Sequence, residues 1–431
     1  MLADCIVTNA LEVITCAGPA PRRGIAQAEA RSIANAAVAS LDGLIVFAGP
    51  ADVCAREVEP AAGCRTVDAA GCTIVPGFVD AHTHLVYAGD RRNELRQRLA
   101  GATYASIAAQ GGGILQTVHA TRDCSEDLLA ATAQVRLREM LRSGTTTCEV
   151  KSGYGLTTES ELKLLRVIRR LSRDGPIDLA PTFMGAHEIP PEYRGRRGDY
   201  VRLIVEEMIP RVAADGLAEW CDVFCEDGVF TVDESRHILR AGLAAGLASR
   251  VHADELGPSG GARLAAELGS RSADHLIFVD RDAARVMARA GTVATLLPAA
   301  GFYLKLGQFA PARMLIDEGV PVALGTDLNP GGGFTPSMPF VMTLACFGMG
   351  MTLEEALVAA TINAACSLNR ENRVGSLEPG KQMDAVIVNG SPIELLRPGA
   401  SAIRTVIKRG RVVHTVESST DVPKPELPHS A

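Results

Sequence analysis

The histidine pair His82 and His84 comes directly after the apolar run CTIVPGFVDA. Residues i and i+2 of a strand point to the same side, so both imidazoles could bind one metal ion at about 2.0–2.1 Å. A His-x-His pair alone is a weak signal, because such pairs also arise by chance or from packing. The apolar strand that leads into this pair strengthens it, since it places both rings at a strand end. The pair therefore predicts a metal site.

Three later residues that could complete such a site follow or lie within apolar runs. His252 lies in ASRVHADE with Glu255 three residues further on, His275 lies in SADHLIF, and Asp327 ends VPVALGTD. Taken singly, a buried histidine or a helix-capping aspartate explains each of them equally well. Together with His82 they match metal-assisted hydrolysis, in which the metal lowers the pKa of bound water and a neighbouring carboxylate or imidazole moves the proton.

Apolar strands that alternate with amphipathic helices would bring these residues together. Short apolar runs alternate with longer segments whose apolar residues recur every three to four positions, and glycine closes several of these segments. About eight strand–helix repeats over some 300 residues are typical of a (β/α)8 TIM-type barrel, an α/β fold whose active site lies at the carboxyl ends of the strands. After the strand that leads to the histidine pair, we expect strands within 145–150, 177–187, 221–226, 248–255, 272–278, 292–298 and 320–327.

Both ends of the chain are rich in β patterns. ADCIVTNALEVIT and LDGLIVFAGP near the N-terminus, and GKQMDAVIVNG and IRTVIKRGRVVHTV near the C-terminus, are typical of strands. We expect these segments to form one small β-sandwich domain from residues 1–72 and 375–431, with the barrel occupying residues 73–374.

The composition excludes several classes of protein. Of 431 residues, 47% are hydrophobic and 22% charged, which is ordinary for a globular chain and excludes a disordered or collagen-like one. The net charge of −7 argues against bulk nucleic-acid binding, which needs a basic face. The longest uncharged stretch, Leu328–Leu353, is interrupted by prolines and glycines, so we expect a loop and a buried helix and no membrane span. Eleven cysteines without a CxxC pair, and no visible secretory signal, predict reduced thiols and a cytoplasmic location.

Short blocks around the candidate residues carry a resemblance. PGFVDAHTHL, VHADE, SADHL and GTD resemble motifs of the metal-dependent amidohydrolase superfamily. EVKSGYGL, and GGGI followed by TVHATR, narrow the resemblance to the imidazolonepropionase family, whose members open a ring in histidine degradation. The matching blocks cover most of the expected barrel, and the β-rich ends fit the superfamily pattern.

The resemblance implies a mononuclear site and a set of groups that move protons. Glu255 and His275 are the implied proton carriers, with Asp327 as a further catalytic group. Whether Asp327 or Glu255 delivers the proton to the ring nitrogen stays open. The metal, zinc or iron, is implied to be held by His82, His84, His252 and Asp327.

The same resemblance implies that Arg91, Tyr154 and His187 bind the substrate. A guanidinium suits an anionic or polar oxygen through its fork of donors. Tyr154 lies in the loop SGYG, where flanking glycines let the backbone approach a ligand closely. Without the resemblance, a turn aromatic would be the default interpretation of Tyr154. Further substrate contacts are implied for Glu255, Asn329, Gly331 and Gly332.

The implied reaction is the hydrolysis of the cyclic amide of 4-imidazolone-5-propanoate to N-formimino-L-glutamate. The resemblance further implies a cytoplasmic enzyme that acts on a small molecule and forms a homodimer. We expect neither nucleic acid nor a membrane among its partners.

Two residues depart from the family pattern. Gly332 stands where a serine or threonine is usual, and Phe334 replaces an expected proline. Because Gly332 removes a hydroxyl that would touch the substrate, a related five-membered ring, such as a hydantoin- or thiohydantoin-propanoate, is the nearest alternative substrate. A purine-type deaminase is another alternative, since it shares the spacing of His252 and Glu255 and the ligand set.

Two other interpretations concern the metal itself. Some superfamily members bridge two metals with a carboxylated lysine, and Lys151 lies near a strand end. Because this lysine belongs to the family's own mononuclear motif, we expect no bridging role. A metal-free scaffold would have lost ligands, and all four implied ligands are present in the sequence.

Overall fold

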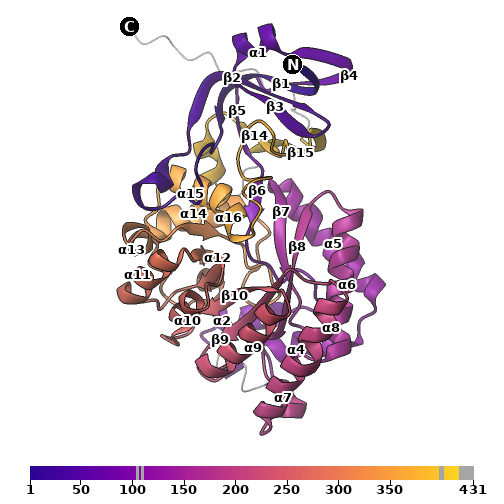
Figure 1. The fold of residues 1–431 in the computed structure, drawn as a ribbon, viewed down its shortest axis with the longest axis vertical. Coiled ribbons are helices and arrows are strands. Elements are labelled where there is room, and N and C mark those ends of the chain that lie inside the picture. Colours follow the sequence, from indigo (N-terminus) through magenta and orange to yellow (C-terminus); the bar gives the residue numbers. More distant parts are fainter. Residues whose placement is uncertain (103–105, 108–110, 398–401, 417–431) are drawn as a thin grey trace.

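The structure is a computed structural model that describes residues 1–102, 106–107, 111–397 and 402–416. Two sheets lie one above the other: a small sheet built from both ends of the chain, and a larger one surrounded by helices (Figure 1). The predicted fold class, a (β/α)8 barrel with a small β domain formed by the two ends, is confirmed.

The larger sheet is an eight-stranded barrel whose strands follow one another in chain order and pair in parallel. Its first and last strands are joined where Ala81 N donates to Leu324 O at 3.4 Å and where Thr83 bridges to Leu328. The strands are β6 (Phe78–Asp80), β7 (Thr145–Lys151), β8 (Asp178–Ala186), β9 (Trp220–Cys225), β10 (Ala248–Ala253), β11 (Ser272–His275), β12 (Val293–Leu296) and β13 (Val322–Leu324).

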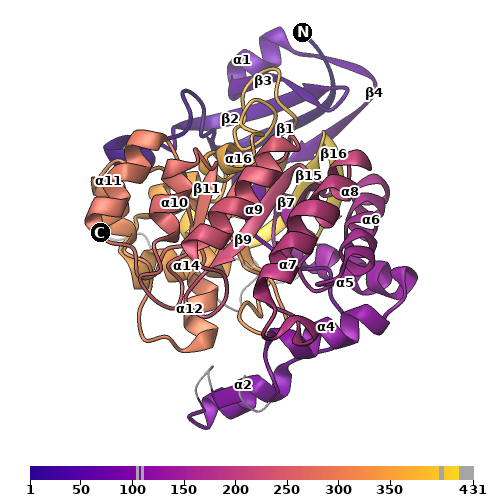
Figure 2. The same cartoon turned by 60° about the horizontal axis from the view of Figure 1, so that its bottom comes forward.

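Helices surround this barrel, as Figure 2 shows from another side. Several of them begin with a side-chain cap, because the first N–H groups of a helix have no partner within it. Thr231 and Glu234 form a capping box on α9, and Asp280 caps α11, which Gly291 ends in the left-handed conformation. The helices are α2 (Arg92–Leu99), α4 (Ile114–Asp123), α5 (Glu126–Arg142), α6 (Thr158–Asp174), α7 (Arg197–Leu203), α8 (Ile209–Ala214), α9 (Val232–Ala244), α10 (Gly261–Glu267), α11 (Arg281–Ala290), α12 (Pro298–Leu304), α13 (Ala312–Asp317), α14 (Met338–Met349), α15 (Leu353–Ala359) and α16 (Ile362–Ser367). A short 3-10 helix, η2 (Pro191–Tyr193), precedes α7, and a π-helical segment, η3 (Ile204–Met208), joins α7 to α8.

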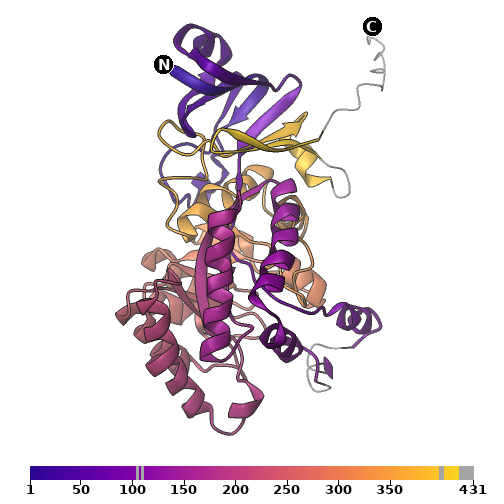
Figure 3. The same cartoon turned by 90° about the vertical axis from the view of Figure 1, so that its right-hand side faces the viewer.

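The small sheet joins strands from the two ends of the chain side by side, and Figure 3 shows the yellow C-terminal strands beside the indigo N-terminal ones. The strand order is β16-β15-β14-β5-β1-β2-β3, and β4 pairs with β1. Buried apolar side chains such as Val7, Val38, Ile74 and Ile387 form its core. Its strands are β1 (Leu2–Ile14), β2 (Ser32–Leu41), β3 (Leu44–Pro50), β4 (Glu59–Asp68), β5 (Cys72–Pro76), β14 (Ala385–Asn389), β15 (Ile403–Lys408) and β16 (Arg411–Thr415). The short helices η1 (Gly24–Ala28), α1 (Ala51–Glu57) and η4 (Pro392–Leu396) lie between these strands in the chain.

The chain passes from the small sheet to the barrel through a single residue, Gly77. A Cβ at this position would lie 2.4 Å from Thr146 Oγ1 in β7, so only glycine allows so close an approach. Since β5 is hydrogen-bonded within the small sheet, the crossing falls between β5 and β6. The domain division at residues 72 and 73 stays a prediction.

The uncharged stretch Leu328–Leu353 forms a loop followed by α14. Met338, Val341 and Met342 are buried on this helix, whereas Phe347 is 80% exposed. Among the described residues, no helix combines the length and the apolar character that a bilayer crossing requires. The predicted loop and helix are therefore observed, although one face of the helix reaches solvent.

Candidate active site

Three histidine side chains meet at the carboxyl ends of the barrel strands. His82 and His84 lie just past β6, and His252 lies on β10. The Nε2 atoms of His82 and His252 are each 3.3 Å from Nε2 of His84. All three side chains are buried, and their ring nitrogens form a group that could hold a metal ion. Barrel geometry thus joins a residue of the fifth barrel strand to the pair beside the first.

Asp327 approaches this group from the loop that follows β13. Its Oδ1 lies 3.5 Å from His82 Nε2 and 3.7 Å from His84 Nε2. Four ligands at about 2.0–2.1 Å from a tetrahedral ion lie about 3.3–3.4 Å apart, close to the spacing of these atoms. Burial, followed by the charges of neighbouring groups, lowers the pKa of His82 and His84 well below its usual value. Because the rings are neutral and can offer lone pairs, the donor set fits one metal ion.

Two carboxylates contact the outer nitrogens of these rings. Asp274 Oδ2 lies 2.7 Å from His82 Nδ1, and Asp222 Oδ2 lies 3.1 Å from His252 Nδ1. A carboxylate at Nδ1 favours the proton on that nitrogen and leaves Nε2 to bind a metal. Sequence reasoning missed both aspartates, although a charged residue inside the apolar runs CDVFC and SADH was a visible signal.

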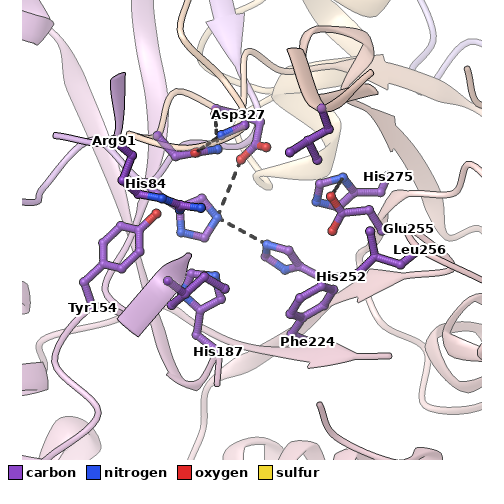
Figure 4. A pocket seen from close by; sticks show the side chains of 14 residues that line it. His84, Arg91, Tyr154, His187, Phe224, His252, Glu255, Leu256, His275 and Asp327 are labelled. Atoms are coloured by element: carbon purple, nitrogen blue, oxygen red, sulfur yellow. Dashed lines mark hydrogen bonds and ion pairs between the residues drawn. The ribbon is translucent and has the colours of Figure 1, made fainter. Parts of the chain in front are cut away.

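The metal donors lie at one cavity, shown in Figure 4. All the predicted site residues line it except His82 and Gly331. Polar groups that converge beside apolar side chains are typical of a small-molecule site. The apolar part of the wall, which sequence reasoning did not identify, consists of Ile114, Phe224, Leu256 and Leu304.

Arg91 is held in the cavity wall by its neighbour Glu94. Its Nε and Nη2 donate to Glu94 Oε2 at 2.9 and 2.8 Å, and both side chains are buried. Gly331 packs against the guanidinium so closely that a Cβ would lie 2.1 Å from Nη1. Gly331 therefore leaves room for Arg91, which explains why this position is glycine without requiring a contact with a ligand.

Tyr154 sits in a loop that one buried carboxylate holds together. Glu161, near the start of α6, accepts hydrogen bonds from the backbone N–H of Gly153 at 2.9 Å and of Gly155 and Leu156 at 2.8 Å. Gly153 has a φ of +98°, which favours glycine. Tyr154 is thereby presented to the cavity by a fixed loop.

His187 connects this loop to the metal donors. Its Nδ1 donates to Gly153 O at 2.9 Å, and its ring stacks on His84 with centroids 4.9 Å apart. Burial lowers the pKa of His187 to about 3, so the ring is neutral. Its Nε2 is then an acceptor, available for an N–H group in the cavity.

Glu255 and His275 form a pair on the opposite wall. Glu255 Oε1 lies 3.5 Å from His275 Nδ1. Burial, followed by the charges of Asp327 and Glu226, raises the pKa of Glu255 well above its usual value. Glu226 also accepts hydrogen bonds from the N–H groups of Glu255 and Leu256, both at 2.9 Å. A buried carboxyl with a raised pKa beside a neutral imidazole suits proton transfer.

The loop after Asp327 is held by the side chain of Asn329. Its Oδ1 accepts from Gly331 N at 2.7 Å and Gly332 N at 2.6 Å, and its Nδ2 donates to Asp327 O at 2.7 Å. A Cβ on Gly332 would meet Asn329 Nδ2 at 3.5 Å, an ordinary contact. The structure therefore has room for the side chain that the family usually carries here.

Lys151 does not face the cavity. Its ammonium lies 2.8 Å from Glu149 and 2.7 Å from Asp222, completely buried. Burial alone would lower the pKa of Lys151, but the nearby carboxylates outweigh it and raise that pKa. Carboxylation of a lysine needs the neutral amine, so this environment supports the expectation that Lys151 bridges no metals.

Comparison with solved structures shows the fold. An atrazine chlorohydrolase from Arthrobacter aurescens complexed with zinc matches with a TM-score of 0.73 and 18% identity, over 95% of this chain and 94% of that one. An adenosine deaminase from Xanthomonas campestris with bound zinc matches with a TM-score of 0.67 and 18% identity, over 95% and 93%.

Sequence comparison is more specific. Residues 73–418 match the model of the Amidohydrolase family. The imidazolonepropionase of Symbiobacterium thermophilum is 51% identical over 95% of this chain and 97% of its own length. That of Geobacillus kaustophilus is 48% identical over 94% and 97%. With these matches spanning almost the whole chain and the metal donors in place, the chain belongs to the amidohydrolase family and, within it, to the imidazolonepropionase family.

Proposed function

We propose that the protein hydrolyses the cyclic amide of 4-imidazolone-5-propanoate to N-formimino-L-glutamate in histidine degradation. The observation that carries the proposal is that three imidazole Nε2 atoms gather beside the cavity that Arg91, Tyr154 and His187 line. The relatives that share about half of this sequence are named imidazolonepropionases.

We propose zinc or iron at the site, held by His82, His84, His252 and Asp327. Three imidazoles and one carboxylate are donors that both metals accept. When bound, such an ion supplies Lewis-acid chemistry and lowers the pKa of water. Metal analysis of the purified protein by mass spectrometry decides between the two.

The substrate would lie between the metal donors and the Arg91 wall. The guanidinium of Arg91 suits the propanoate carboxylate, which can accept two parallel hydrogen bonds. Tyr154 and Nε2 of His187 face the same space and would hold polar atoms of the ring. Asn329 keeps the neighbouring loop in place through its contacts with Gly331 and Gly332.

Proton transfer falls to Glu255 and His275. Glu255, which lies in the cavity with a raised pKa, would take a proton from the attacking water. It would then transfer this proton to the ring nitrogen as the C–N bond breaks. Asp327 is the alternative carrier for the second step. His275 would donate a hydrogen bond to the oxygen on which negative charge develops.

The test is to incubate the metal-analysed protein with freshly generated 4-imidazolone-5-propanoate. Loss of the ring absorbance together with formation of N-formimino-L-glutamate, absent in His252→Ala, supports the proposal. A fully metallated protein that leaves the ring intact rejects this substrate, and hydantoin- and thiohydantoin-propanoate are then assayed. Ammonia released from a purine would instead indicate a deaminase.

We also propose a cytoplasmic homodimer that binds neither nucleic acid nor membranes, with residues 1–72 and 375–431 as one domain and 73–374 as the other. The net charge of −7 disfavours a phosphate backbone as a partner. The exposed Phe347 on the uncharged helix α14 is a side chain that a second copy could cover. Sedimentation of the parent and of Phe347→Asp tests the dimer, and limited proteolysis tests the domain division.

A further inference from the structure

A cluster of buried charges lies beneath the metal donors, on the side away from the cavity. It contains two cations and three carboxylates, all completely buried. Buried charges are costly unless each is paired, so such a cluster persists only with a close network of contacts. Its members are Glu149 and Lys151 on β7, Asp222 on β9, Arg250 on β10 and Asp274 on β11.

Lys151 is the member that touches most of the others. Its Nζ lies 2.7 Å from Asp222 Oδ2, 2.8 Å from Glu149 Oε1 and 3.9 Å from Asp274 Oδ2. Asp222 Oδ2 is also the atom nearest His252 Nδ1, and Asp274 Oδ2 is the atom 2.7 Å from His82 Nδ1. One ammonium group thus reaches both carboxylates that hold the rings of two metal donors.

The third carboxylate links Lys151 to the histidine pair through the backbone. Glu149 Oε2 accepts from the N–H of Thr83 at 3.1 Å, and the N–H of Lys151 donates to Thr83 O at 3.0 Å. Thr83 stands between His82 and His84 in the sequence. The contacts of Lys151 therefore extend to the supports of all three histidines.

The two carboxylates that contact His82 and His252 differ in how many cations they contact. Asp274 has a second cation, because Arg250 Nη2 lies 3.1 Å from its Oδ2. For Asp222, the described residues offer Lys151 as the one lysine or arginine within ion-pair distance. Removing the ammonium should therefore disturb His252 more than His82.

We propose that Lys151 is a positioning residue of the metal site, whose ammonium holds Asp222, Asp274 and Glu149 so that three imidazole Nε2 atoms face one ion before it binds. This inference rests on the metal site of the proposed function, yet it makes its own claim about metal affinity. Loss of a group that orients metal ligands typically weakens binding by about 10–100-fold.

The experiment compares Lys151→Met with Lys408→Met. Lys408 is also a buried lysine between two carboxylates, 2.9 Å from Asp178 Oδ2 and 2.6 Å from Asp384 Oδ2, where the small sheet meets the barrel. The dissociation constant for zinc is measured by competition with a chromophoric chelator, and the visible spectrum of the cobalt-loaded protein reports ligand geometry. We expect Lys151→Met to bind zinc about 10–100-fold more weakly and to alter the cobalt spectrum, with Lys408→Met unchanged in both.

Zinc binding by folded Lys151→Met with the parent's affinity and spectrum would overturn the proposal. If Lys151→Met does not fold, the double variant Lys151→Met/Glu149→Gln removes one charge of each sign. Parent-like zinc affinity in this variant would show that Lys151 only balances charge, which also overturns the positioning role. If the proposed substrate is wrong, the zinc-loaded parent protein leaves the imidazolone ring intact, and this result is distinct from a change in zinc affinity. A parent that binds no zinc would overturn both.

Discussion

Two lysines of this chain lie buried between pairs of carboxylates, one beneath the metal donors and one between the two sheets. Lys151 lies between Glu149 and Asp222, and Lys408 between Asp178 and Asp384, at 2.6–2.9 Å in every case. Neither ammonium is more than 5% exposed. The local chemistry of the two regions is therefore almost the same.

The regions differ in what the carboxylates touch on their other side. Asp222 also contacts Nδ1 of His252. In contrast, Asp178 Oδ1 accepts from Nη2 of Arg409 at 2.6 Å, and Asp384 Oδ1 accepts from the backbone N–H of Arg409 at 2.9 Å. Asp178 begins β8 of the barrel, and Lys408 ends β15 of the small sheet. The cluster around Lys151 thus orients a metal ligand, and the contacts of Lys408 hold two parts of the fold together. Removing the first lysine should therefore change zinc affinity, and removing the second should change stability.

The largest expected effect is a loss of stability at the joint, by which we mean the contacts of Lys408 with Asp178 and Asp384 between the two sheets. Lys408→Met leaves Asp384 buried without its ammonium, and breaking a buried pair in this way costs about 3–5 kcal/mol. We expect urea denaturation of the metal-free protein to show a loss of that size. The zinc dissociation constant of the variant should equal that of the parent. Weakened zinc binding would mean that the joint also supports the metal site, and the distinction between the two clusters would fail.

A second pair of variants tests the carboxylates themselves. Asp222→Asn removes the charge that contacts both Lys151 and His252, so zinc should bind about 10–100-fold more weakly. Asp178→Asn makes the same chemical change at the joint and should leave zinc affinity unaltered. Both constants come from chelator competition. Equal losses in the two variants would point to a general effect of buried charge.

Another buried carboxylate, Glu161, has backbone N–H groups as partners in place of a lysine. In Glu161→Gln the amide keeps one acceptor oxygen but turns a donor toward one N–H, at a cost of about 1–2 kcal/mol. Because the loop carries Tyr154, we expect KM for the ring substrate to rise with little change in zinc affinity. The neighbouring surface variant Glu159→Gln is the control and should change stability by less than about 0.5 kcal/mol. A KM equal to that of the parent would show that the order of this loop does not affect substrate binding.

Much of the fold and of the metal site could be predicted because the signals are local. Alternating apolar runs and amphipathic segments indicate strands and helices, and the barrel places their carboxyl ends at one rim. His82, His84, His252 and Asp327 each follow or end an apolar run, so knowing the fold brings them together. The structure confirms that their side chains converge.

The parts that could not be predicted depend on contacts between distant residues. Asp222 and Asp274 are visible as polar residues in strands, but which histidine nitrogen each one touches depends on the barrel's register. Gly331 faces Arg91 across a loop contact that no local pattern encodes. The same holds for Lys151. Its environment argues against metal bridging and supports a positioning role, but this environment exists only once four strands are placed together.

The smallest expected effect is a pH dependence confined to the joint. Burial, opposed by Lys408 and by the N–H of Arg409, raises the pKa of Asp384, with Asp178 adding to the rise. A carboxyl whose folded pKa exceeds its unfolded value of about 3.9 costs stability as it ionises, so the cost appears when the pH rises through that range.

Lys408→Met removes the opposing charge, and the pKa of Asp384 should rise further. The stability deficit of the variant should therefore be smaller at pH 5 than at pH 8, by about 1 kcal/mol, because more of the Asp384 carboxyl is protonated at the lower pH. Urea denaturation of the metal-free parent and variant at both pH values measures the change. Lys408→Met/Asp384→Asn has no carboxyl to titrate at this position, so its deficit should be the same at both. If the double variant keeps the dependence, the titrating group lies elsewhere, and the strength of the joint is not set by the Lys408–Asp384 pair.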